Sequence, residues 1–431
     1  MASSANWFRQ AIFLLGLLVL TAGLTGYARL GQGYPICGTD EQNYLNIFAW
    51  LDNGGVWPIS GPGYLELVWR LRQWSGWDIR PLVVAVAALN SSVVLPLGIW
   101  VLYRISLGSA ESAWRCLPWL FVSSYFLGSW LEGRPQQLGM LLAAMGAWQA
   151  YRDLREHGRC SVGFLLLWML CFGYHALSFV ILTALVFGFW AWRFVQGQSG
   201  YRALLVLLLG LTGCLALGPW WYPLIWLDIR INQIRGAAVG EFFGVLVIAA
   251  TGGLLLLHRL RHHPIDPVLM GRLRAGLTAP WIYGLIAGSA VLALIWQYAW
   301  LGHLYRGINR GVVVWYQSGN ILLAALFLSG LWRMSRESMP ELAFFGQSCL
   351  ILIAFGGAFL VLTPWLRDHN WTLRILSYWT WYAAPLAAWG WSALPASWRW
   401  GTLLASPIML AGGLRHVLDA PTWICRIGGQ G

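Results

Sequence analysis

Long apolar runs separated by short polar segments fill the chain from end to end. Because a helix needs about 20 mostly apolar residues to cross a bilayer, this pattern predicts an all-α, polytopic membrane protein with about 13 transmembrane helices. The runs at 161–174 and 176–193 are short for a span. The predicted spans are 11–29, 81–103, 116–131, 136–151, 161–174, 176–193, 203–222, 242–258, 279–300, 318–333, 344–366, 376–394 and 401–414.

The longest segment between spans, about residues 30–80, follows the first apolar run. Apolar and aromatic residues recur in it at helical spacing, in "NYLNIFAWLDNGGVW" and "GYLELVWRLRQWSGW". This spacing predicts two short helices lying in the membrane interface, joined by the turn "PISGPG". The alternative is that most of the tryptophans here form an aromatic belt.

Composition supports a membrane protein and excludes an ordinary soluble domain. The chain is 58% hydrophobic and only 10% charged, and it holds 31 tryptophans in 431 residues. We find no internal repeat and no soluble segment of useful size at either end. Residues 1–431 are therefore expected to form a single membrane domain without a soluble C-terminal domain.

Arginines predict the orientation, because cytoplasmic loops of membrane proteins are enriched in positive charge. With the N-terminus inside, 15 of the 28 basic residues and six of the 16 acidic ones face the cytoplasm. The basic charge therefore reports topology rather than binding to nucleic acid. The arginines predicted to be cytoplasmic are Arg9, Arg104, Arg115, Arg152, Arg155, Arg159, Arg193, Arg202, Arg259, Arg261, Arg272, Arg274, Arg333, Arg336 and Arg399.

The first run also fits a cleaved signal peptide, because Arg9 precedes an apolar stretch and small residues. Its length and the lack of a clean A-x-A site favour an uncleaved first helix. Of the seven cysteines, only Cys37 and Cys425 are expected on the outer face, where a disulfide bond is possible. No cysteine or histidine spacing indicates a structural zinc site.

Polar residues at the outer boundary are the first place to look for chemistry, since ionisable groups beside spans are costly to keep there. Asp40 and Glu41 follow the first span in "GTDEQNYL". As an alternative to catalysis, Asp40 can cap the predicted interfacial helix, whose N-terminus favours acidic side chains.

Two further polar groups interrupt the apolar pattern. "WLEGRPQQLG" places Glu132, Arg134 and Gln136 in a very short turn between the third and fourth spans. "CFGYHALSF" places Tyr174 and His175 between two short apolar runs. In the first case the alternative is mutual neutralisation in a tight loop, and in the second it is anchoring at the interface.

Late outer loops carry a fourth group of polar residues, and these are cationic. Guanidinium groups bind phosphate through paired hydrogen bonds, so this group can seat an anion; contact with lipid headgroups is the alternative. The group comprises Arg306, Arg310, Arg367, His369 and Arg374.

Taken in order, the motifs "GTDEQNYL", "EGRPQQLG" and "GYHALSF" resemble the GT-C class of integral-membrane glycosyltransferases. The plan is similar to protein mannosyltransferases, lipid A aminoarabinose transferases and arabinosyltransferases. The resemblance covers about the first 180 residues; the later half is similar in hydropathy alone. Many members also carry a large periplasmic C-terminal domain, whereas only about 17 residues follow the last predicted span here.

The resemblance implies a role for each group. Asp40 would be the general base on an acceptor hydroxyl, with Glu41 in support. Glu132, Arg134 and Gln136 would organise the donor phosphate and sugar, and Tyr174 and His175 would line the same pocket. It also implies a polyprenyl-phosphate sugar as donor, a periplasmic protein or glycan as acceptor, and a bacterial inner membrane as location.

A pentofuranose such as arabinose, delivered to a pilin or an envelope glycan, is the narrower expectation. No cofactor is required if arginines stabilise the phosphate, although the carboxylates also allow a divalent cation. Two other classes stay open. A lipid-linked sugar flippase or other transporter would show repeats or charges near the middle of spans. A structural subunit of a membrane complex would need no polar site.

Overall fold

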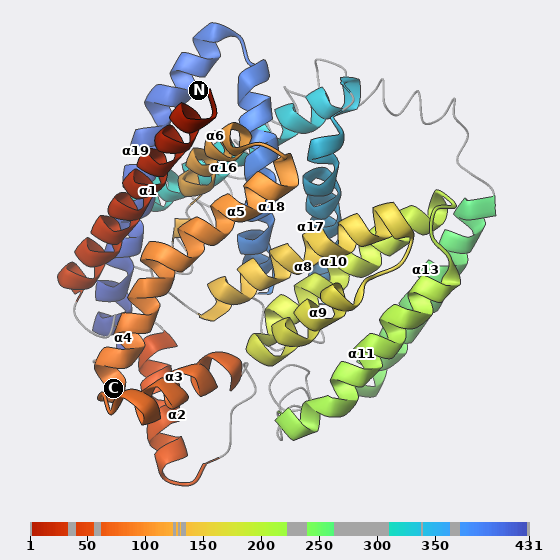
Figure 1. Ribbon diagram of the computed structural model, residues 1–431, viewed down its shortest axis with the longest axis horizontal. Coiled ribbons are helices and arrows are strands. Elements are labelled where there is room, and N and C mark those ends of the chain that lie inside the picture. The colour runs from red at the N-terminus through yellow and green to blue at the C-terminus, as the bar shows by residue number, and fades with distance from the viewer. Residues whose placement is uncertain are drawn as a thin grey trace.

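The structure is a computed structural model that describes residues 2–32, 40–55, 62–123, 126–127, 130, 135–221, 239–262, 310–337, 339–362 and 371–428. All elements in these ranges are helical and none is a strand, which confirms the predicted all-α class (Figure 1). A π-helical turn, η1 (Asn90–Val94), joins α4 to α5, and a 3-10 turn, η4 (Pro340–Leu342), precedes α17. The α-helices are α1 (Ala2–Gln32), α2 (Asp40–Asp52), α3 (Pro62–Ser75), α4 (Ile79–Leu89), α5 (Leu95–Leu107), α6 (Ala110–Val122), α8 (Pro135–His157), α9 (Val162–Tyr174), α10 (Ala176–Val195), α11 (Tyr201–Trp221), α13 (Val239–His262), α16 (Arg310–Arg336), α17 (Ala343–Leu362), α18 (Trp371–Ala393) and α19 (Ala396–Gly428).

Side-chain caps and a left-handed glycine set several helix ends. Gly108 has φ 69° and ends α5, a conformation in which a side chain would be strained. Ser109 then caps α6 by accepting a hydrogen bond from the backbone N–H of Ser112. Ser161 caps α9 in the same way, and Asp78 caps α4. These caps mark where each helix begins or ends within the polar segments between the apolar runs.

The two helices predicted in the first loop are confirmed as α2 and α3. The predicted span 116–131 is wrong in its extent, because α6 begins at Ala110 and ends at Val122. Ser123 has extended ψ (121°), and its N–H bonds to the carbonyl of Leu120, which closes the helix. The last helix is longer than the predicted 401–414, since α19 runs through Gly428. The predicted span 279–300 lies outside the described residues.

Aromatic rings fill the centre of the bundle, where α8, α10, α17 and α18 meet. Phe344 of α17 is the hub: its ring lies 5.1 Å from Trp148, 5.4 Å from Tyr151 and 5.7 Å from Tyr382. These tilted and edge-on arrangements are favourable for aromatic pairs. The core therefore joins helices that are distant in sequence through one continuous cluster.

Glycines allow α16 and α18 to pack with their backbones in contact. A Cβ atom on Gly330 would lie 2.0 Å from the carbonyl oxygen of Leu386, and one on Gly390 would lie 2.0 Å from that of Leu326. No larger residue fits at either position. Small residues at helix contacts are typical of helices that pack within membranes.

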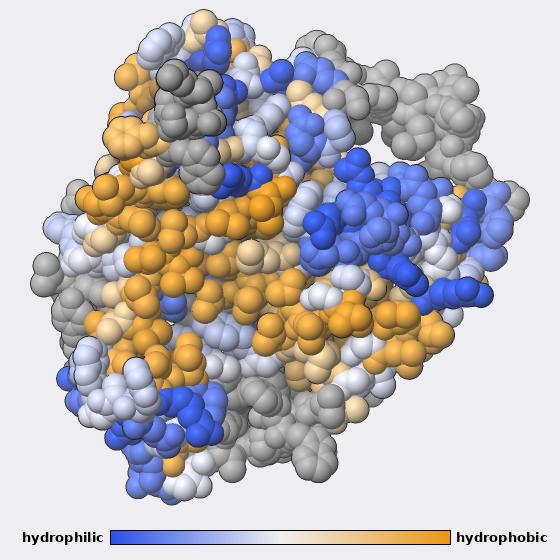
Figure 2. All heavy atoms as spheres, viewed as in Figure 1, coloured by the Kyte–Doolittle hydropathy of each residue, from blue (hydrophilic) through white to orange (hydrophobic). Residues whose placement is uncertain are grey.

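An apolar band crosses the face seen in Figure 2, between hydrophilic patches over the α8–α9 turn and over α2 and α3. Within the described ranges, four helical segments are long and apolar enough to cross a membrane: Gln10–Tyr27, Ile79–Leu107, Ala176–Val195 and Pro340–Ala358. Three shorter helices, including Val162–Tyr174, are also apolar. The structure is thus consistent with a helical membrane protein.

Several of the predicted cytoplasmic arginines make or line contacts between helix ends of the described structure. Arg115, Arg333 and Arg399 line one cavity, although they come from α6, α16 and α19. Arg261 of α13 donates a hydrogen bond to the carbonyl of Ser199, whose hydroxyl donates to the carbonyl of Gly158. We call this side of the molecule the arginine end.

Candidate functional site

The opposite end of the molecule, which we call the loop end, is built on α2 and α3. The rings of Phe48 and Trp69 stack with centroids 6.1 Å apart. Arg72 donates to both carboxylate oxygens of Asp52, at 2.9 and 3.1 Å, and its guanidinium lies 5.3 Å from the Trp69 ring. Apolar stacking and an ion pair therefore hold the two first-loop helices together.

The start of α3 lies directly against the end of α9. A Cβ atom on Gly63 would be 2.8 Å from the carbonyl oxygen of Gly173. The rings of Tyr64 and Tyr174 meet edge to face at 6.5 Å. The Tyr174 hydroxyl is buried and has no hydrogen-bond partner among the residues that the structure describes. Tyr174, predicted as a site residue, thus connects the first loop to the bundle.

His175 occupies the single-residue junction between α9 and α10. Its backbone is extended (φ −156°), and Nδ1 accepts a hydrogen bond from the backbone N–H of Ser178 at 3.2 Å. An amide N–H can only donate, so Nδ1 carries no proton and the neutral ring bears it on Nε2. The Ser178 hydroxyl lies 2.8 Å from Nδ1 and 2.5 Å from the Tyr378 hydroxyl. The consistent assignment is a relay in which Tyr378 donates to Ser178 and Ser178 donates to His175.

Gly139 brings the start of α8 to this junction. A Cβ atom there would lie 2.5 Å from Ser178 Oγ and 2.8 Å from His175 Cβ. Gly139 ends the motif "EGRPQQLG", so the second and third motifs of the sequence meet in space. Two residues earlier, Gln137 is buried and neither polar atom of its side chain has a partner in the described structure. A buried amide without partners is costly, and such a group is commonly met by water or a ligand.

Trp130 fixes the chain just before the turn that holds Glu132 and Arg134. Its indole N–H donates to the carbonyl of Ser91 at 2.7 Å, and the Ser91 hydroxyl donates back to the carbonyl of Trp130 at 2.8 Å. Ser91 belongs to the π-helical turn η1, a rare feature that is frequent at functional sites. Trp130 is therefore held by two hydrogen bonds, two residues before Glu132 in the sequence.

The remaining predicted residues divide into two sets. Asp40 and Glu41 are the first two residues of α2, and Gln136 is the second residue of α8. Arg310 begins α16 and Arg374 lies in the first turn of α18. Outside the described residues are Glu132, Arg134, Arg306, Arg367, His369 and the proposed partner cysteine Cys37.

The N-termini of α16 and α18 lie toward the loop end, as the direction of the two helices shows. Arg333 and Ser392, near the other ends of these helices, are joined by a 2.7 Å hydrogen bond at the arginine end. Tyr378, seven residues after the start of α18, contacts Ser178 at the His175 junction. The structure thus brings the start of α8 and the first turns of α18 to the His175 junction, and α3 of the first loop packs against the end of α9.

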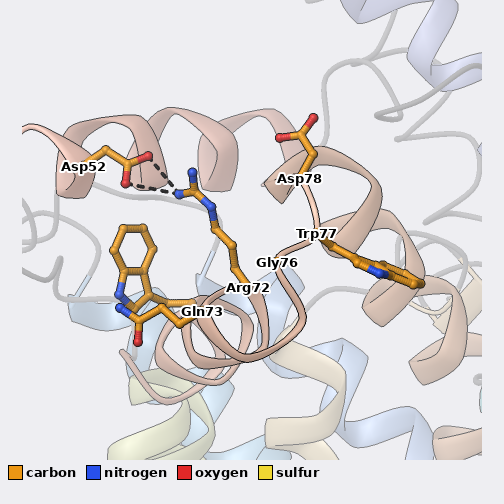
Figure 3. A pocket seen from close by; sticks show the side chains of 7 residues that line it. Asp52, Arg72, Gln73, Gly76, Trp77 and Asp78 are labelled. Carbon is orange, nitrogen blue, oxygen red and sulfur yellow. Dashed lines mark hydrogen bonds and ion pairs between the residues drawn. The ribbon is translucent and has the colours of Figure 1, made fainter.

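An open cleft of about 470 Å³ lies at the loop end, between α2 and the α3–α4 connection. Figure 3 shows the side chains that line it. Asp52, Arg72 and Gln73 lie on one side of it, with Trp77 and Asp78 beyond. Sequence reasoning assigned no role to this cleft. Its residues come from the end of α2, the end of α3 and the α3–α4 connection, and the helical spacing that predicted α2 and α3 does not report that these segments meet.

Ser178 and Tyr378 were also missed, because 200 residues separate them in the chain. In the described part of the structure, no three His, Cys, Asp or Glu side chains are grouped so that they could hold a metal ion. This statement does not extend to the carboxylates of Asp40, Glu41 and Glu132, whose side chains the structure does not describe.

No protein-family model matches the chain, and no curated protein is significantly similar to it.

Proposed function

We propose that the protein is a GT-C-type glycosyltransferase that moves a sugar from a polyprenyl-phosphate donor to an acceptor hydroxyl at the periplasmic face of a bacterial inner membrane. The observation that carries the proposal is the convergence at the loop end. Gly139, which ends "EGRPQQLG", lies against His175, and α3 of the first loop packs against the end of α9. This meeting of the second and third motifs beside the first-loop helices supports one active site, to which we assign Asp40 at the start of α2.

In this proposal Asp40 removes the proton from the acceptor hydroxyl as its oxygen attacks the anomeric carbon. The bond from that carbon to the phosphate oxygen breaks, through a transition state with oxocarbenium character. Arg134 and the late-loop arginines stabilise the departing phosphate by charge-assisted hydrogen bonds. A metal is not needed when arginines do this, whereas Asp40, Glu41 and Glu132 offer oxygen ligands if a divalent cation takes part.

His175 has a defined part in this scheme. Because its Nδ1 accepts from Ser178, the proton on Nε2 makes that atom a hydrogen-bond donor. The Tyr378–Ser178–His175 relay holds the ring in this tautomer. We propose that His175 donates to a donor oxygen in the same pocket as Gln136 and Tyr174.

The cleft in Figure 3 lies at the Asp52 end of α2, about 18 Å along the helix from Asp40, and we propose that it holds a distal part of the acceptor. Trp77 offers an exposed apolar ring, while Asp52, Gln73 and Asp78 offer hydrogen-bonding groups. This combination suits a polar molecule with apolar faces, such as a glycan. A pentofuranose passed to an envelope glycan or a pilin is the narrower proposal.

The experiment compares envelope glycans and surface proteins by mass spectrometry in strains with and without the gene. We expect a mass increment of one sugar residue to be lost in the deletion strain and restored by the wild-type gene. Complementation with Asp40→Asn should not restore it, whereas Glu66→Gln, at an exposed i,i+4 pair in the same loop, should. Loss of the increment with accumulation of lipid-linked sugar on the cytoplasmic side would indicate a flippase instead, because a missing transferase leaves its donor on the periplasmic side. An unchanged glycan profile would contradict the proposal.

A further inference from the structure

At the arginine end, three guanidinium groups line a cavity of about 660 Å³. Arg115 comes from α6, Arg333 from α16 and Arg399 from α19. The rest of the lining is the Ser392 hydroxyl together with tryptophan, proline, alanine and leucine side chains. The lining thus has three positive charges and no acidic residue.

Two of these arginines have acidic neighbours that lie outside the cavity. Arg115 pairs with Glu111 at 2.5 Å, and both side chains are mostly exposed, at 65% and 76%. Arg333 pairs with Glu337 at 3.0 Å and also donates to Ser392. Exposed pairs of this kind contribute little and are easily exchanged for a better anion. The Arg399 side chain makes no ion pair or hydrogen bond to any described residue.

An apolar groove of about 690 Å³ continues from this cavity between α1, α6 and α19. Pro118, Trp119 and Leu403 line both, so the cavity and the groove adjoin. Figure 1 shows α1 and α19 side by side along this part of the molecule. Beyond the shared residues, carbon side chains and one serine line the groove.

The groove has the length of one bilayer leaflet. It follows α1 from Ile12 to Leu24, twelve positions, or about 18 Å at 1.5 Å per residue. On α6 it reaches Val122 and on α19 it reaches Leu410, each further from the arginines along its helix. Half of a hydrocarbon core about 30 Å thick is about 15 Å.

We propose that this composite site holds an anionic phospholipid, with its phosphate between Arg115, Arg333 and Arg399 and an acyl chain in the groove. Only an amphiphile matches both parts, since a free phosphate leaves the groove empty and an apolar helix leaves the arginines unneutralised. The lipid belongs to the leaflet at the arginine end. The site lies at the far ends of α16 and α18 from the His175 junction, so it is independent of the proposed transferase site.

The test uses the full chain purified in mild detergent, titrated with phosphatidylglycerol or phosphatidylcholine, with lipid retention followed by native mass spectrometry. We expect one phosphatidylglycerol to bind at least tenfold more tightly than phosphatidylcholine. Arg333→Gln with Arg399→Gln should remove that preference. Arg155→Gln, at an exposed arginine away from the cavity, should leave it unchanged.

A second variant tests the groove without touching the arginines. Gly16 lines the groove and has open space around it, so Gly16→Trp should fill the groove and reduce phosphatidylglycerol retention at least tenfold in a folded protein. Inorganic phosphate should not compete. The proposal is overturned by equal binding of both lipids, by full retention in either the arginine or the Gly16→Trp variant, or by competition from inorganic phosphate.

Discussion

At the scale of single residues, the loop end contains a histidine whose structural and chemical roles can be separated. His175 caps α10, a role that the sequence did not indicate, and it also holds a defined tautomer. The sequence singled it out only because it interrupts two apolar runs. Its partners Ser178 and Tyr378 could not be predicted, since a serine and a tyrosine within apolar helices give no signal until tertiary packing pairs them.

His175→Asn separates the two roles, because asparagine is a good N-cap but lacks the imidazole donor. We expect a nearly unchanged melting temperature and a fall in sugar transfer of about 10²-fold, typical of losing one transition-state hydrogen bond. Thermal unfolding and initial transfer rates are the measurements. Tyr378→Phe should show a smaller loss of the same kind. Equal transfer rates for wild type and His175→Asn would show that His175 only caps α10.

Cys160, in the α8–α9 turn, gives a pH-dependent test at the arginine end. Burial raises the pKa of its thiol to about 12, and the nearby carboxylate of Asp153 contributes in the same direction. Because the pKa is higher in the folded than in the unfolded protein, the neutral thiol contributes to the free energy of unfolding. This contribution is fully present below pH 9 and is lost as the pH rises from 9 to about 12.

At pH 8 only about one Cys160 in 10⁴ is a thiolate. We expect iodoacetamide to modify a variant retaining Cys160 alone very slowly, with a rate that rises tenfold per pH unit. Asp153→Asn should lower the pKa and speed modification at fixed pH. A rate that levels off near pH 9 would contradict a buried thiol beside a carboxylate.

At the scale of elements, apolar periodicity predicted most helices but not their ends. The first-loop helices were foreseen from their amphipathic spacing. The end of α6 was not, because the apolar run continues past Val122 while Ser123 turns the backbone and bonds to Asn320 of α16. That bond joins residues 197 positions apart, so no local window reports it. Which helices pack against each other could not be predicted either. The sequence does not distinguish a glycine at a close helix contact from a glycine on an open face.

The α16–α18 contact provides a direct test of this packing. Gly330→Ala puts a Cβ atom 2.0 Å from the Leu386 carbonyl, so the helices must separate. We expect a loss of about 1 to 3 kcal/mol and a melting temperature several degrees lower in detergent. Gly401→Ala is the matched control, because nothing lies within 4 Å of that position and alanine favours the helix. Similar melting temperatures for both variants would contradict the backbone contact.

At the scale of the whole molecule, the arrangement sorts polar residues into two ends. The arginine end carries arginines that the positive-inside rule assigns to the cytoplasm, and the loop end joins α3, the start of α8 and the α9–α10 junction. Charge bias could be read from the sequence because it depends only on composition between apolar runs. The meeting of α3, α8 and α9 could not, because it depends on the tertiary packing of Gly63 and Gly139.

Orientation follows from these two ends and is tested by labelling in intact cells. Gln73 is exposed at the loop end and Arg155 is exposed at the arginine end. In a variant lacking the native cysteines, we expect a membrane-impermeant maleimide to label Gln73→Cys and not Arg155→Cys until the membrane is permeabilised. The reverse pattern would place the proposed active site in the cytoplasm and require a different donor.

The central claim is that the loop end performs sugar transfer with Asp40 as the base. The most direct measurement is transfer of a radiolabelled pentose from a short-chain polyprenyl-phosphate donor to an envelope acceptor by the purified protein in detergent. The proposed mechanism predicts turnover by wild type and by Glu66→Gln, and a rate lower by about 10² to 10⁴ for a folded Asp40→Asn protein. Turnover by Asp40→Asn at the wild-type rate would contradict this, and Asp40 would then serve only to begin α2.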